Sequence, residues 1–116
     1  MKLVVIESPY AGDIERNVAY ARAAMLDALR RGEAPLASHL IYTQPGILRD
    51  EIAEDRALGI AAGLAWGRLA ALAAFYTDLG WSEGMRRARE HWERVGLLVE
   101  ERSLDPQPTD RRKQQP

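Results

Sequence analysis

Residues 2–13 read KLVVIESPYAGD, a short apolar run followed by turn residues. Residues 2–7 predict a buried strand, because the run is brief, rich in Val and Ile, and bounded by Ser8 and Pro9. Gly12 and Asp13 then supply a turn and a helix N-cap. The stretch therefore predicts a strand that leads through a short loop into a helix, which is how a β-α-β unit begins.

The same alternation continues to about residue 100. Apolar residues recur at helical spacing over residues 14–29, and Arg30-Arg31-Gly32 is typical of a helix end. Further strands are expected at residues 34–40, 72–76 and 97–100, and further helices at residues 50–70 and 83–94. Strands that alternate with helices predict an α/β fold with a parallel sheet covered on both faces.

The totals point to one domain. A chain of 116 residues fits a domain at residues 1–102, and residues 103–116 are polar and proline-rich, which predicts a disordered tail. The absence of cysteine excludes disulfides, thiol catalysis and thiolate metal sites. Two isolated histidines predict no metal site, and no residue pattern indicates a cofactor.

The charge and hydropathy of the chain limit the classes of partner to be expected. A net charge of −1 gives no general case for binding DNA or RNA. The N-terminus has no secretory signal, and no segment approaches the roughly 18 apolar residues of a membrane helix. We therefore expect a cytoplasmic protein with a small-molecule ligand.

Ligands of parallel α/β sheets bind outside the carboxyl ends of the strands. This rule selects the loop with Ser8 and Tyr10, then His39, then Asp78, and finally the helix start at residues 82–85. A helix N-terminus favours an anion, and a strand-end loop with one aromatic residue suits a sugar or base. The alternatives are an ordinary Ser82 N-cap, a plain β-α turn and a structural histidine.

Two further features leave alternatives open. Arg86, Arg87 and Arg89 either help to hold an anion at residues 82–85 or form a solvated helix face. Glycines four residues apart, at positions 59, 63 and 67, predict a close backbone approach on one helix face. The element that approaches is either the sheet or the same helix of a second subunit, which would make a homodimer.

The sequence also resembles a known group of proteins. The matching stretches are residues 5–13 with Asn17, residues 35–40, Arg56 with Gly59 and Gly63, and residues 82–85. They resemble the nucleoside 2-deoxyribosyltransferase-like superfamily, and more closely a short uncharacterised domain family of bacteria and phages (DUF4406/DUF7768-like). Over residues 3–100 the resemblance implies a flavodoxin-like or Rossmann-like three-layer fold with a four- to five-stranded parallel sheet, in dimers or larger assemblies.

The resemblance also implies roles for single residues. Enzymes of that superfamily cleave the N-glycosidic bond of deoxynucleosides or deoxynucleotides through a carboxylate that attacks the sugar. By position, Tyr10 resembles the aromatic residue near the sugar, and Asp78 resembles a carboxylate after the third strand. Ser82 and Gly84 resemble the turn that holds phosphate or sugar. Ser8, His39 and Met85 complete the expected ligand-binding set.

The nucleophile is where the chain departs from the enzymes. Their glutamate lies four residues after the glycine matched by Gly84, and this chain has Ala88 there. Glu90 lies about 200° further around the helix and cannot simply replace it. The sequence therefore favours a nucleoside- or nucleotide-binding protein. The alternatives are a deoxyribosyltransferase or N-glycosidase that uses Asp78 or Glu83, and a non-catalytic interaction module.

Overall fold

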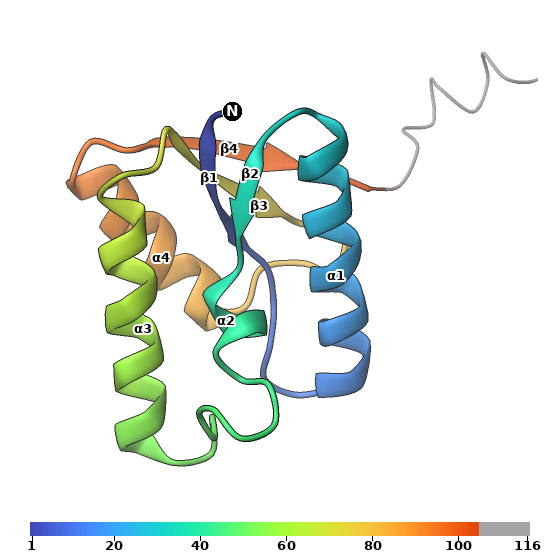
Figure 1. Ribbon diagram of the computed structural model, residues 1–116, viewed down its shortest axis with the longest axis vertical. Coiled ribbons are helices and arrows are strands. Elements are labelled where there is room, and N and C mark those ends of the chain that lie inside the picture. Colours follow the sequence, from blue (N-terminus) through green and yellow to red (C-terminus); the bar gives the residue numbers. More distant parts are fainter. Residues whose placement is uncertain (105–116) are drawn as a thin grey trace, which may run out of the picture.

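A four-stranded parallel sheet forms the centre of residues 1–104, the part of the chain that the computed structural model describes (Figure 1). The strands are β1 (Leu3–Glu7), β2 (Ala34–Leu36), β3 (Leu72–Tyr76) and β4 (Leu98–Arg102), in the order β2-β1-β3-β4. All five residues of β3 are buried, as expected for a central strand with both faces covered. This arrangement confirms the predicted α/β fold with its parallel sheet.

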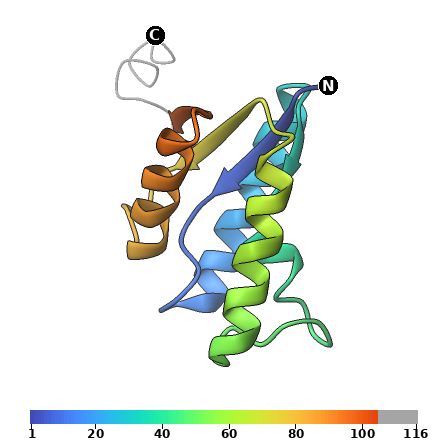
Figure 2. The same ribbon diagram turned by 90° about the vertical axis from the view of Figure 1, so that its left-hand side faces the viewer.

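Helices cover both faces of the sheet (Figures 1 and 2). Helix α1 (Ile14–Arg30) packs its small residues, such as Ala24 and Ala28, against Val4, Ile6 and neighbouring side chains. Helices α3 (Ala53–Gly67) and α4 (Glu83–Arg94) lie on the opposite face. There the core contains Val5, Phe75, Met85 and Trp92. The described residues contain no helix long and apolar enough to cross a membrane.

The predicted helix caps are present. The Asp13 carboxylate accepts the amide N–H of Arg16 at 3.2 Å and begins α1. The Ser82 hydroxyl accepts the amide N–H of Met85 at 3.2 Å and begins α4. Both caps satisfy donors that a helix leaves without an intrahelical partner.

The second predicted strand is wrong beyond Leu36. Residues 38–41 instead form a short helix, α2 (Ser38–Ile41), so His39 is helical and does not end a strand. Polar side chains hold this turn: the Thr43 hydroxyl donates to the His39 carbonyl at 2.7 Å, and the Gln44 amide donates to the Leu40 carbonyl at 2.9 Å. These contacts give the backbone an alternative to strand pairing, which the apolar pattern alone does not reveal.

The end of the domain also differs from the prediction. Strand β4 continues to Arg102, two residues beyond the expected limit. Ser103 and Leu104, expected in the tail, both donate hydrogen bonds to the Asp78 carboxylate. The remainder of the predicted tail, residues 105–116, lies outside the described residues.

The glycines of α3 make the predicted close contacts, but the elements that approach them are α2, α4 and the loop before α3 and not the sheet. A Cβ at position 63 would lie 2.7 Å from the Ser38 hydroxyl oxygen, and a Cβ at position 67 would overlap the Trp92 ring. Gly67 therefore lets the end of α3 approach α4. A Cβ at position 59 would lie 3.3 Å from the Leu48 side chain.

Candidate functional site

A cavity of about 780 Å³ lies at the carboxyl ends of the strands, between α3 and α4. Val5 and Glu7 of β1 contribute from the sheet, and Gly59, Ile60 and Gly63 contribute from α3. Cavities of roughly 300–1,000 Å³ are typical of small-molecule sites. The cavity is therefore large enough for a ligand of nucleotide size.

The structure brings most of the predicted site residues together in this cavity. They come from the loop after β1, from α2, and from the first turn of α4. The predicted site residues that line the cavity are Ser8, Tyr10, His39, Ser82, Glu83, Gly84 and Met85. Three segments far apart in the sequence thus meet at one edge of the sheet.

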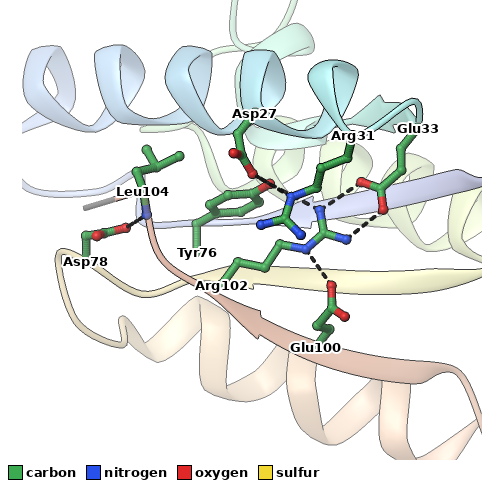
Figure 3. A network of polar contacts seen from close by, with 8 residues as sticks. All are labelled: Asp27, Arg31, Glu33, Tyr76, Asp78, Glu100, Arg102 and Leu104. Atoms are coloured by element: carbon green, nitrogen blue, oxygen red, sulfur yellow. Dashed lines mark hydrogen bonds and ion pairs between the residues drawn. The ribbon is translucent and has the colours of Figure 1, made fainter. Parts of the chain in front are cut away.

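Asp78 is the predicted site residue that does not line the cavity. Its carboxylate accepts hydrogen bonds from the Tyr20 hydroxyl at 2.5 Å and the Ser103 hydroxyl at 2.6 Å. It also accepts one from the Leu104 amide at 2.9 Å (Figure 3). Tyr20 belongs to α1, on the other face of the sheet. This position gives no support to the expected catalytic or ligand-binding role of Asp78, because its carboxylate joins α1 to the end of the domain.

The first turn of α4 offers fewer free amides than a bare helix end. The Met85 amide is capped by the Ser82 hydroxyl, and the Arg86 amide donates to the Ser82 carbonyl at 3.1 Å. The amides of Glu83 and Gly84 have no partner within residues 1–104. A Cβ at Gly84 would come no closer than 3.9 Å to another residue, so packing within the protein does not require glycine there.

Charged groups around this turn are partly paired. The Glu83 carboxylate accepts a hydrogen bond from Arg87 at 3.2 Å, and both side chains are exposed. Arg87 and Arg94 line the cavity, whereas Arg86 does not. Arg89 instead contacts Glu101 at 3.0 Å and lies over the Trp81 ring. Of the three arginines considered from the sequence, Arg87 is the one placed to meet a ligand.

His39 and Ser8 form a pair at the cavity wall. The Ser8 hydroxyl oxygen lies 2.6 Å from Nε2 of His39. Burial lowers the pKa of His39 to about 4, so the ring is neutral at pH 7. A neutral ring can exchange hydrogen bonds with a ligand but provides no positive charge for an anion.

Residues 2–102 match the model of the family DUF7768, described as a domain of unknown function. The chain belongs to the DUF7768 family. A comparison with curated proteins gives no match.

The DUF7768 domain is also similar to a solved enzyme structure. That protein is a 2-deoxyribosyltransferase from the psychrotolerant bacterium Bacillus psychrosaccharolyticus. The two share a TM-score of 0.61 and 15% sequence identity, over 90% of this chain and 74% of that chain. At this identity the likeness shows a shared fold.

Sequence reasoning missed Glu7, the acidic residue that ends β1 of this DUF7768 domain. Its side chain points to the α3–α4 face, where Oε2 accepts a hydrogen bond from Trp92 Nε1 at 2.8 Å. Burial raises the pKa of Glu7 to about 7, although the Trp92 hydrogen bond acts in the opposite direction. An acid at the end of an apolar run is an ordinary strand boundary, and the signal that distinguishes Glu7 is its contact with Trp92, 85 residues away.

Proposed function

We propose that the cavity binds a nucleoside or nucleotide. The observation that carries the proposal is the meeting of the β1 loop, α2 and the first turn of α4 around one cavity of about 780 Å³. Tyr10 provides an aromatic ring with a polar hydroxyl, as nucleoside sites often do. Gly84 and Arg87 provide an approachable backbone and a positive charge for a phosphate.

A thermal-shift experiment tests binding. The four common 2′-deoxynucleosides and their 5′-monophosphates are added separately, and a ligand that binds the native state raises the melting temperature. We expect Arg87→Ala to weaken the binding of the monophosphate by about tenfold, a loss on the order of 1.4 kcal/mol, and to leave the binding of the nucleoside unchanged. Arg86→Ala is the matched control, because Arg86 has the same charge on the same helix and does not line the cavity.

Gly84→Ala provides a second measure of the same site. The added methyl group meets no neighbour closer than 3.9 Å, so we expect the variant to remain as stable as the wild type or slightly more stable. Ligand binding is expected to weaken, because the methyl group occupies space beside the free amides. If no member of the panel shifts the melting temperature, the binding proposal fails and a non-catalytic interaction module becomes the better description.

The second candidate is an N-glycosidase or deoxyribosyltransferase. It is favoured by the fold shared with a 2-deoxyribosyltransferase and by the carboxyl groups of Glu7, Glu83 and Glu90 in the cavity. Incubation with the same panel, followed by chromatography for free base, tests it. Sustained base release that Glu83→Ala abolishes would favour catalysis over binding alone.

We also propose that the domain forms a homodimer in the cytoplasm. The support is the exposure of two large apolar side chains of α3, Leu58 and Trp66, neither of which lines the cavity. Exposed apolar patches are typical of interaction surfaces. We expect a dimer mass in sedimentation equilibrium, and a monomer mass across the concentration range would contradict the proposal.

A further inference from the structure

We propose that the free carboxyl oxygen of Glu7 binds a hydrogen-bond donor of the ligand, either an N–H of a base or an O–H of a sugar. The inference rests on the proposed function, because it assigns a ligand contact within the same cavity. It goes further by naming the atom that contacts the ligand from the sheet side and the kind of donor group whose hydrogen bond this atom accepts.

One half of the carboxyl group is held by the protein. Trp92 Nε1 donates to Oε2 of Glu7 at 2.8 Å, and the Trp92 side chain is buried and packed closely against Gly67. A donor fixed in this way restricts how the carboxyl group can turn. The indole therefore positions Glu7 but satisfies only one of its two oxygens.

The other half of the carboxyl group is open to the cavity. Oε1 of Glu7 has no hydrogen-bond partner within residues 1–104. In the same part of the chain, every fully buried polar side-chain atom has a partner. Oε1 is therefore accessible, and Glu7 is among the residues that line the cavity.

No basic side chain of the described residues neutralises Glu7. Other ionisable groups from every element around the cavity share its lining. These groups are His39 of α2, Asp50 of the following loop, Asp55 and Arg56 of α3, and Glu83, Arg87, Glu90, His91 and Arg94 of α4. Arg56 is paired with Asp50 at 3.5 Å, and Arg87 with Glu83 at 3.2 Å. Within residues 1–104, Trp92 is the side chain that bonds Glu7, and no charged group acts on its carboxyl group, so Oε1 is left for a donor on a ligand.

Binding of such a donor should release protons from the protein, which can be measured. Without ligand, burial holds the pKa of Glu7 near 7, so about half of the molecules carry a protonated Glu7 at pH 7. A donor on the ligand favours the charged carboxylate and lowers that pKa. Each binding event at pH 7 should therefore release up to about half a proton, and affinity should rise with pH between 6 and 8.

Isothermal titration calorimetry at pH 7 in two buffers of different ionisation enthalpy measures this release. The probes are the four 2′-deoxynucleosides, which carry no group that titrates near pH 7. We expect wild-type protein to release about half a proton for the nucleosides that bind. We expect Glu7→Gln to release none and to bind about tenfold more weakly, although its amide oxygen can still accept from Trp92. Glu54→Gln is the matched control and should behave as the wild type, because Glu54 is an exposed carboxylate of α3 that does not line the cavity.

The outcomes separate the two proposals. Binding by the wild type with no proton release, or equal affinity in Glu7→Gln, would overturn the role of Glu7 and leave the proposed function standing. The wild-type measurement decides this even if Glu7→Gln does not fold. Failure of every nucleoside and monophosphate to bind the wild type would remove both proposals.

Discussion

Replacing Arg102 with Met should lower the free energy of unfolding by about 3–5 kcal/mol, the usual cost of breaking a buried ion pair by removing one partner. Arg102 ends β4, and its side chain is 3% exposed. It donates to both oxygens of Glu33, at 2.8 Å and 2.7 Å (Figure 3). Without the guanidinium, the Glu33 carboxylate would stay buried without its hydrogen-bonded cation and would keep only the coulombic attraction of Arg31 and Lys2.

The position of Arg102 explains why the loss should be large. No helix within residues 1–104 follows β4 to cover its α1-side face. Instead the Arg102 side chain reaches across Tyr76 of β3 to Glu33, the residue before β2, and so connects the two edges of the sheet (Figure 3). The Tyr76 hydroxyl in turn donates to Asp27 of α1 at 2.7 Å. One side chain thus links α1 with three of the four strand segments.

Chemical denaturation with two comparison variants tests the explanation. Glu100→Gln removes a partner of Arg102 that is 45% exposed, and should cost no more than about 1 kcal/mol. The double variant Glu33→Leu/Arg102→Met removes both charges and should recover most of the loss. A similar cost for Arg102→Met and Glu100→Gln would show that the buried pair contributes little.

The fold was accessible from the sequence because local signals agree with the tertiary structure. The buried apolar run of β3, the Asp13 and Ser82 caps, and the alternation of strands and helices each indicate the same architecture. The prediction failed at β2, where the side chains of Thr43 and Gln44 stabilise a helical turn over residues 38–41. Such local side-chain bonds do not change the hydropathy pattern.

The site was only partly accessible for a related reason. The topological rule correctly placed loops after β1 and before α4 at one cavity, because it depends only on strand direction. It also selected Asp78, whose side chain turns to Tyr20 and Ser103 on the other face. Which face a strand-end side chain reaches depends on contacts between distant residues. The role of Glu7 depends on Trp92 in the same way.

Glu7→Gln and His39→Gln should change the pH dependence of stability in opposite directions. Burial raises the pKa of Glu7 from 4.5 to about 7, so the folded state holds more protons than the unfolded state and stability falls as pH rises through this window. Burial lowers the pKa of His39 from 6.5 to about 4, so stability rises with pH over that range. Between about pH 4.5 and 6.5 the two slopes largely cancel in the wild type.

Each substitution should therefore expose the slope of the other group. Glu7→Gln should match the wild type at pH 4 and exceed it by up to about 3 kcal/mol at pH 8, and its own stability should rise between pH 4.5 and 6.5. His39→Gln should instead lose stability as pH rises from 4.5 to 7, because His39 no longer offsets the pH dependence that Glu7 contributes. Urea denaturation at half-unit pH intervals measures all three proteins. Contributions that all three proteins share, such as those of Asp27 and Glu33, cancel when their free energies of unfolding are subtracted. If the difference between Glu7→Gln and the wild type stayed constant from pH 4 to pH 8, it would contradict a buried, neutral carboxyl group at the cavity.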